Sequence, residues 1–164
     1  MSNYLSVKIT PDFEQRYPGA SPEATECAMN LVLTADLLEK QIARLLQPFR
    51  LSPASALVLS ILADTETPVS PNQIADRLII SRASVTSLID SLEKHGYVIR
   101  QPHGSDRRML LIELTDSGHQ IAGQFRPIVH QHQHQWLNVL SVQEQEQLIQ
   151  TLHRLQAALI HFDA

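Results

Sequence analysis

Three serine–proline pairs mark where helices begin in this chain: Ser21-Pro22, Ser52-Pro53 and Ser70-Pro71. A serine caps a helix because its side-chain oxygen accepts a hydrogen bond from a free backbone N–H of the first turn. Proline suits the next position, where its missing N–H would have no partner and its fixed φ already fits a helix. Two further pairs, Ser70 with Gln73 and Ser141 with Glu144, have the spacing of a capping box. These signals predict a mainly helical chain with well-defined helix starts.

Hydrophobic periodicity and turn residues predict the remaining layout. The helices are expected over residues 22–47, 53–64, 71–78, 82–95, 116–140 and 142–161, and two strands over Tyr97–Arg100 and Met109–Leu114. The first 20 residues contain prolines and a glycine without periodicity, so we expect an extended arm there. Pro127 falls inside the fifth helix and is expected to bend it, because its ring clashes with the carbonyl four residues earlier.

Overall composition narrows the class of protein. The 164 residues are 43% hydrophobic, which suits one compact domain or a small domain with appended helices. No apolar run approaches the roughly 18 residues of a membrane span and no signal peptide is visible, so we expect a cytoplasmic protein without a membrane partner. The single cysteine, Cys27, excludes an internal disulfide. Because no phosphate loop, nucleophile elbow or His-Glu-x-x-His motif is present, neither enzymatic activity nor a cofactor is expected.

Residues 71–95 read as two helices joined by a short turn. The second helix is expected to start at the cap Ser81 and to stop at Gly96 in a left-handed conformation. Apolar residues at helical spacing predict the inward faces, which are Ile74, Ala75 and Leu78 in the first helix and Val85, Leu88, Ile89 and Leu92 in the second. The other side of the second helix carries short polar residues, which permit a close approach to base edges in a DNA major groove. A solvated helical hairpin without a ligand is the alternative.

A basic hairpin follows this helix pair. Two apolar strands flank a polar turn followed by Asp106-Arg107-Arg108, and an arginine near such a tip can enter the negative minor groove of DNA. Residues 72–108 carry six basic and four acidic side chains, so this module is mildly basic within a chain of net charge −4. A general nucleic-acid coat protein would be strongly basic throughout. The charge pattern therefore favours localised DNA contact.

Four segments of the chain resemble the MarR family of transcriptional regulators. They are LSPASALVLSIL, PNQIADRL, SRASVTSLIDSLEKHGYVIR and DRRMLLIELTDSG, which together cover about residues 51–118. The resemblance implies a mainly α fold with a small β wing, that is, a winged helix-turn-helix whose N- and C-terminal helices form a dimerisation region. The implied parts are an arm (1–20), a first dimerisation helix (21–50), a winged-helix DNA-binding lobe (51–115) and C-terminal dimerisation helices (116–164).

The resemblance also implies DNA contacts at individual positions. The major groove would be met by Ser81, Arg82, Ser84, Thr86 and Ser87, with Arg82 as the leading base or phosphate contact. In the wing, Arg108 would enter the minor groove, Asp106 would orient the wing or Arg108, and Arg107 would contact phosphate. The family's two-fold homodimer places two recognition helices one DNA turn apart. The expected partner is therefore double-stranded DNA with a palindromic operator whose half-sites lie about 10 bp apart.

The resemblance further implies a repressor that a small, often phenolic or anionic, effector releases from DNA, and no motif identifies the effector pocket. Two alternatives concern the signal. Cys27 lies early in the first long helix, as does the sensing cysteine of peroxide-responsive members, but the carboxylates of Glu23 and Glu26 disfavour a thiolate and favour an inert, partly buried thiol. His130 and His134 are four apart on a helix and could ligate one zinc ion, or could lie on a solvated polar face. An adaptor that uses the winged helix to bind protein is the alternative to DNA binding.

Overall fold

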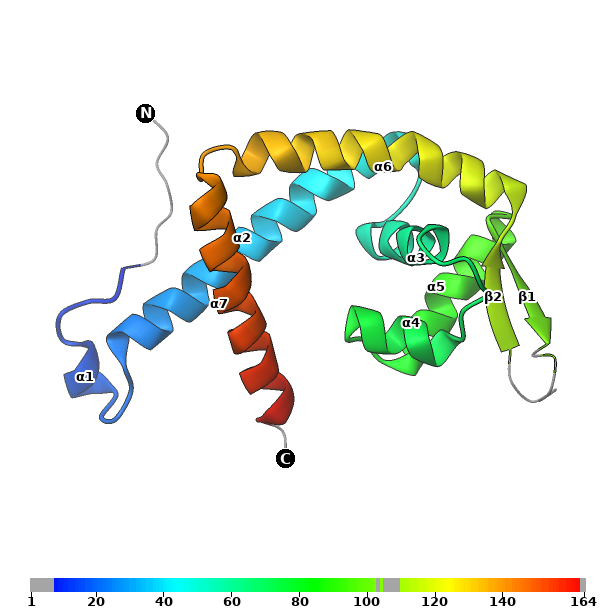
Figure 1. Ribbon diagram of the computed structural model, residues 1–164. Coiled ribbons are helices and arrows are strands. Elements are labelled where there is room, and N and C mark those ends of the chain that lie inside the picture. Colours follow the sequence, from blue (N-terminus) through cyan, green and yellow to red (C-terminus); the bar gives the residue numbers. More distant parts are fainter. Residues whose placement is uncertain (1–7, 103, 105–109, 163–164) are drawn as a thin grey trace.

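The computed structural model describes residues 8–102, 104 and 110–162. In chain order its elements are α1 (Phe13–Arg16), α2 (Pro22–Leu46), η1 (Gln47–Phe49), α3 (Pro53–Ala63), α4 (Pro71–Leu78), α5 (Arg82–Lys94), β1 (Val98–Pro102), β2 (Leu110–Leu114), α6 (Asp116–Leu137) and α7 (Val142–His161). Helices α3, α4 and α5 and the two strands form a lobe near the start of α6, and α7 lies at its other end (Figure 1). The expected mainly helical chain with a two-stranded hairpin is confirmed.

All six predicted helix starts are confirmed, because a hydroxyl side chain caps each one. The caps are Ser21, Ser52, Ser70, Ser81, Thr115 and Ser141, and each accepts a hydrogen bond from the backbone N–H three residues later. Both predicted capping boxes form, at Ser70 with Gln73 and at Ser141 with Glu144. Side-chain caps are local interactions between residues close in sequence, which is why the sequence predicted them well.

The end of α6 differs from the prediction. The helix stops at Leu137 instead of continuing to residue 140. Leu140 donates its backbone N–H to the carbonyl of Leu137 at 3.0 Å, and the Gln145 amide donates to the carbonyls of Leu137 (3.1 Å) and Leu140 (3.0 Å). Gln145 belongs to the next helix, so this interaction, which closes the turn into α7, has no signal within α6 itself. Pro127 lies within α6, and the helix continues on both sides of it.

The N-terminal arm contains one turn of helix, α1, where an extended segment was expected. Two contacts between residues four apart support this turn. Arg16 pairs with Asp12 at 2.6 Å, and the rings of Phe13 and Tyr17 lie 5.0 Å apart. Such pairs stabilise short helical segments by a few tenths of a kcal/mol each. Before α1, the arm lies beside α2, where the backbone N–H of Ile9 donates to the Glu26 carboxylate at 3.3 Å.

The core of the lobe lies between α3, α4, α5 and the hairpin. Its most deeply buried side chains include Val58, Leu59, Ile74, Val85, Ile89, Leu92, Val98 and Ile112. Both predicted inward faces are confirmed, since Ile74 and Ala75 are buried in α4, and Val85, Ile89 and Leu92 are buried in α5. Val69 exchanges two backbone hydrogen bonds with Ile112, which ties the segment before α4 to the hairpin.

The hairpin is antiparallel and extends further than expected. Val98 pairs with Leu114 and Pro102 pairs with Leu110, so Gln101 and Pro102 belong to β1 rather than to the turn. Proline is tolerated at the end of an edge strand because no ladder hydrogen bond requires its N–H. The Gln101 amide also donates across the strands to the Glu113 carboxylate. Strand β1 thus ends two residues later than predicted and begins one residue later, at Val98 instead of Tyr97.

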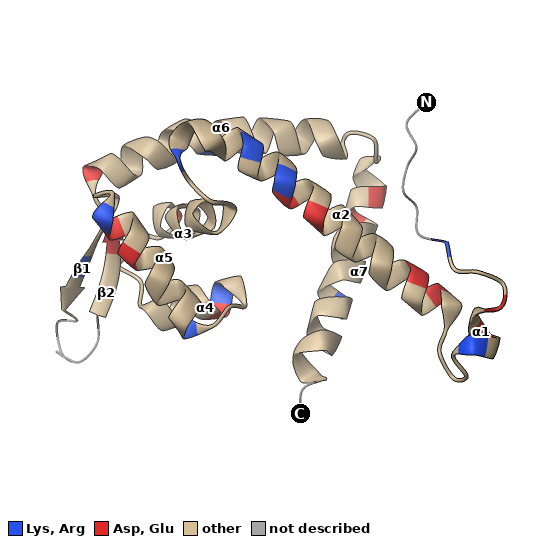
Figure 2. Ribbon diagram, turned by 180° about the vertical axis from the view of Figure 1, so that it is seen from behind, with Lys and Arg blue, Asp and Glu red and all other residues tan. Residues whose placement is uncertain are grey.

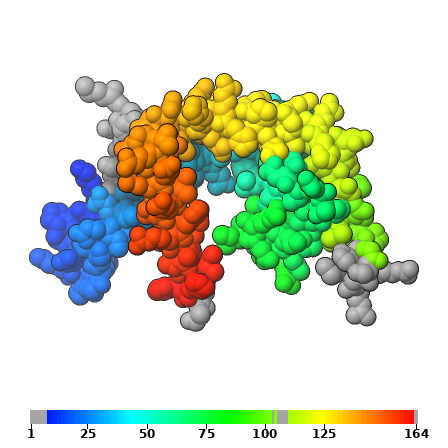
Figure 3. Space-filling view, viewed as in Figure 1, coloured from blue at the N-terminus to red at the C-terminus, as the bar shows by residue number. Residues whose placement is uncertain are grey.

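Helix α7 packs little against the rest of the described chain. It has no buried residue, and Leu155, Leu159 and Ile160 are among its exposed apolar side chains. The space-filling view shows α7 and the lobe as two masses below α6 with a notch between them (Figure 3). Among the described residues no single helix is long and apolar enough to cross a membrane, although the pair Pro22–Phe49 and Pro53–Ala63, bent by 75°, reaches that length and hydropathy jointly.

Candidate nucleic-acid interface

The turn between α4 and α5 sets the direction of the second helix. The residue after α4 is its C-cap, Ile79, which adopts a left-handed conformation with φ +53°. The backbone N–H groups of Ile79 and Ile80 both donate to the carbonyl of Ala75. Ser81 then caps α5 by accepting a hydrogen bond from the Ser84 N–H at 3.1 Å. Two helices joined by so short a turn form the predicted helix-turn-helix.

The five residues predicted to meet the major groove lie together on the outer surface of α5. Because Val85, Ile89 and Leu92 anchor the helix to the core, the opposite face remains open. The exposed residues there include Ser81, Arg82, Ser84, Thr86 and Ser87. Within the described ranges Arg82 has no salt bridge, so its guanidinium is not committed to a carboxylate. The structure therefore gathers these side chains on one surface, and their roles at DNA remain a proposal.

The hydroxyl groups on this face are oriented by the helix itself. Thr86 donates to the carbonyl of Arg82 at 3.0 Å, and Ser87 donates to that of Ala83 at 3.2 Å. A hydroxyl that donates its one proton internally still offers lone pairs as acceptors. Thr86 and Ser87 thus favour external donors, such as the amino groups of adenine and cytosine in the major groove.

The C-terminal half of α5 is engaged by the wing instead. Arg100 on β1 forms ion pairs with Asp90 and Glu93 of α5. The hydrogen bond from Arg100 to Asp90, together with the negative charge of both acids, raises the pKa of the guanidinium further above its usual range. Acidic and basic segments adjoin where α5 meets the strands (Figure 2). Arg100, one of the six basic residues of the 72–108 module, therefore joins β1 to α5. The sequence did not reveal this role.

The end of α5 is fixed against the start of α6. Gly96 has φ +74°, as predicted, and its N–H donates to the Glu93 carbonyl at 2.8 Å. The Thr115 hydroxyl donates to the Gly96 carbonyl at 2.6 Å, and the Thr115 N–H donates to the Tyr97 carbonyl at 3.1 Å. The residue that caps α6 thereby holds the turn between α5 and β1. Helix α5, the hairpin and α6 therefore meet at this one point.

The three predicted wing contacts, Asp106, Arg107 and Arg108, lie outside the described residues. Strands β1 and β2 end beside this segment, with Pro102 opposite Leu110. In Figure 1 this end of the hairpin lies on the side of the lobe away from α6, as does α4. The roles of the three residues stay predictions from the resemblance.

An ion pair joins the lobe to α6. Arg126 of α6 pairs with Asp64, the residue that ends α3. The Nε atom of Arg126 is buried and has no hydrogen-bond partner within the described part of the chain. Sequence reasoning missed this pair because its members are 62 residues apart. The Arg126 guanidinium, at the junction of the lobe and α6, is therefore paired with Asp64 but not fully hydrogen-bonded within the described residues.

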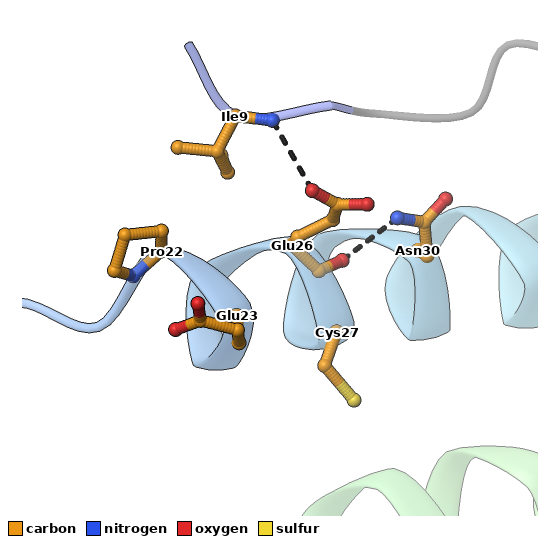
Figure 4. Close-up of a pocket in the computed structure, with 6 residues that line it drawn as sticks. All are labelled: Ile9, Pro22, Glu23, Glu26, Cys27 and Asn30. Carbon is orange, nitrogen blue, oxygen red and sulfur yellow. Dashed lines mark hydrogen bonds between the residues drawn. The ribbon is translucent and has the colours of Figure 1, made fainter. Parts of the chain in front are cut away.

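Cys27 lies in an open pocket of about 510 Å³ between the arm and α2. The lining residues are Ile9, Pro22, Glu23, Glu26, Cys27 and Asn30, which include two carboxylates and no basic side chain. Figure 4 shows the thiol pointing away from the Ile9 segment. The expected partial burial is wrong for the single protomer, where Cys27 is exposed. Nothing in this lining favours a thiolate.

The two histidines suggested for zinc are not joined by further ligands. The His130 ring lies 3.2 Å from the Gln133 side-chain oxygen, and both His130 and His134 are exposed. Across the described ranges no group of three or more histidine, cysteine, aspartate or glutamate side chains could hold a metal ion. A zinc site at this pair would need ligands from elsewhere.

Known proteins similar to this chain are transcriptional regulators, which agrees with the helix-turn-helix seen in the structure. The family model described as MarR family matches residues 51–109, which contain α3, α4, α5 and β1. The chain is 27% identical over 150 residues to the HTH-type transcriptional regulator PecS of Dickeya dadantii, covering 90% of this chain and 89% of PecS. It is 34% identical over 91 residues to the transcriptional repressor MprA of Escherichia coli K12, covering 56% of this chain and about half (52%) of MprA.

The fold is also that of a solved structure with DNA. The MepR–DNA complex from S. aureus superposes with a TM-score of 0.76 at 21% identity, covering 80% of this chain and 96% of MepR. At that identity the match concerns the fold. Together with the family model and the sequence relatives, it identifies the lobe as a winged helix-turn-helix. Residues 51–109 of this chain match the MarR family, and the relatives of the chain are named as transcriptional regulators or repressors, in agreement with the resemblance seen in the sequence.

Proposed function

We propose that this protein is a homodimeric, sequence-specific DNA-binding repressor that a small-molecule effector releases from a palindromic operator. The observation that carries the proposal is the exposed face of α5, which presents Arg82 and short hydroxyl side chains. The other face of this helix is buried in the core of the lobe. A free guanidinium beside small polar residues suits the major groove, where it can bond guanine or phosphate. PecS is named as a transcriptional regulator, MprA is named as a transcriptional repressor, and MepR was solved in complex with DNA. These descriptions support the proposal.

The dimer is supported by apolar surface that one protomer leaves uncovered. On α7, Leu148, Leu155 and Leu159 are exposed and recur at i, i+7 and i+11, so they share one face of the helix. On α2, Val32 and Leu37 are also exposed. Large contiguous apolar surfaces mark sites of association. A two-fold dimer that buries these helices would hold two copies of α5 at a fixed spacing, as a palindrome requires.

Release by an effector is supported by the ion pair between lobe and long helix. An anion that bound the Arg126 guanidinium would compete with Asp64 for it. That competition would loosen α3 from α6 and so alter the position of α5. An effector acts only through such a difference in affinity between two conformations. The Arg126 junction is accordingly the effector site we favour.

The function is tested by selecting genomic fragments with the purified protein. We expect enrichment of a palindrome, bound with an affinity that falls steeply with salt because phosphate contacts release counterions. Arg82→Ala should weaken binding roughly tenfold or more, whereas Ser84→Ala should change the preferred bases. Lys40→Ala removes an exposed cation from α2 and serves as the control, with affinity retained. Failure to enrich any palindrome would contradict the proposal.

The same binding assay separates the possible signals. Salicylate, zinc and peroxide are each added to the preformed complex. Release by salicylate that disappears in Arg126→Gln supports the proposed junction. Release by zinc or by peroxide alone would instead favour His130 and His134 or Cys27.

A further inference from the structure

The turn between α4 and α5 holds an isoleucine in a backbone conformation that suits glycine. Ile79 has φ +53° and ψ +45°, in the left-handed region. A side chain branched at Cβ crowds the backbone there, so this is a genuine outlier for isoleucine. Arg50, with φ +55°, is the other non-glycine residue with positive φ in the described ranges, and its side chain is unbranched at Cβ.

Packing within the protomer does not account for this isoleucine. Its side chain is 65% exposed, whereas its neighbours Leu78 and Ile80 pack against the core. The hydrogen bonds that form the turn use only the backbone N–H groups of Ile79 and Ile80. Glycine would make the same bonds without crowding. The fold therefore contains a strained and largely solvated apolar residue that it does not need.

The position of Ile79 supplies a reason. It lies two residues before Ser81, the cap of α5, and three before the exposed Arg82. Helix α4, which it ends, lies on the side of the lobe farthest from α6 (Figure 1). The residue thus adjoins the surface proposed to meet DNA. Strained residues that the surrounding structure maintains are concentrated at functional sites.

We propose that Ile79 reads sequence, by contacting the 5-methyl group of a thymine at the edge of the half-site. In the major groove, thymine carries a 5-methyl group that the other three bases lack. Apolar side chains recognise thymine by contact with this methyl group. Ile79 would add one base to those met by Arg82 and Ser84. This inference rests on the proposed function.

The test replaces each thymine of the selected operator in turn by deoxyuridine, which removes only the methyl group. Wild-type protein should lose about fourfold in affinity at one position, the factor expected for exposing one methyl. Ile79→Gly should bind the thymine and uracil forms of that position equally. Because the strain is relieved, its Tm should be unchanged or higher, by up to about 4 °C.

Arg50→Gly is the matched control, since it relieves the same backbone conformation outside the helix-turn-helix. It should keep the preference for thymine at that position. A preference for thymine that Ile79→Gly retains everywhere would overturn the inference, as would a clear fall in the Tm of Ile79→Gly. Either of these outcomes would contradict the role of Ile79 but not the proposed repressor function. Failure to select any operator would contradict the repressor function itself.

Discussion

Gly118 shows how one absent methyl group determines an arrangement of elements. A Cβ at this position would lie 2.0 Å from the carbonyl oxygen of Tyr97 and 3.0 Å from Leu114 Cδ2. The Tyr97 oxygen cannot easily yield, because it accepts the hydrogen bond from the Thr115 N–H. The first turn of α6 can therefore touch the α5–β1 turn only if residue 118 is glycine.

We expect Gly118→Ala to destabilise the protein by about 3 kcal/mol, in the range of substitutions that force a backbone displacement. Urea unfolding followed by circular dichroism measures this. Gly123→Ala is the control in the same helix, because its Cβ would meet nothing within 4 Å. Alanine there should stabilise by roughly 0.5–1 kcal/mol, since glycine is a poor helix former. Equal stability of the two variants would refute the steric argument.

Residues of the candidate site were predictable from the sequence to different degrees. The polar face of α5 followed from periodicity, because the buried positions Val85, Ile89 and Leu92 leave only one side free. The partners of Arg100 and Arg126 did not follow, since each pair joins separate elements through tertiary packing. The strain at Ile79 was equally hidden, because nothing in the residue type indicates a left-handed backbone.

At the level of elements, all six helix starts and five of the six helix ends were predictable to within one residue, and the end of α6 was not. A start depends on a side chain and an N–H three residues apart, as at Ser141 and Glu144. An end can depend on another element, as when Gln145 closes the turn after α6. The short α1 was missed for a related reason, because a single turn is too short to show periodicity.

The cap of α7 makes a prediction about acid. The Ser141 hydroxyl and backbone N–H both donate to the Glu144 carboxylate and lower its pKa below the ordinary value of 4.5. A group with a lowered folded pKa contributes stability above its unfolded pKa and loses it as the pH falls through the folded value. The first turn of α7 should accordingly stay capped at neutral pH and fray only below about pH 4.5.

An NMR titration of the Glu144 side chain measures this pKa directly. In Ser141→Ala the carboxylate loses the hydroxyl donor but keeps the backbone donor, so its pKa should rise part of the way toward the ordinary value. A Glu144 pKa that Ser141→Ala leaves unchanged would contradict the role of the cap.

At the scale of the whole molecule, the exposed apolar face of α7 predicts the assembly. Leu159 is 61% exposed in the protomer. Burial of such a side chain against a partner contributes about 1.5–3 kcal/mol, and a glutamate there would instead have to be desolvated. We expect Leu155→Glu combined with Leu159→Glu to shift the protein from twice 18.4 kDa toward 18.4 kDa in light scattering.

Gln150→Glu is the control for added charge, because residue 150 lies on the opposite side of α7 from Leu155 and Leu159. It should leave the mass unchanged. The double variant should also bind the operator more weakly, since a monomer places only one α5 on DNA. A dimeric mass for the double variant would show that this face of α7 is not the interface.

The ion cluster at the far end of α5 limits how much sequence one helix can distinguish. Because Asp90 and Glu93 are bound to Arg100, the side chains of α5 proposed to meet the major groove lie within the six residues 82–87. At 1.5 Å per residue they span about 9 Å, or about three base pairs. A triplet recurs about once in 64 base pairs by chance, far too often in a genome with millions of competing sites. Selectivity would then reside largely in the distance between two triplets, so a substitution that changes the angle of α6 could redirect the protein to other genes without touching DNA.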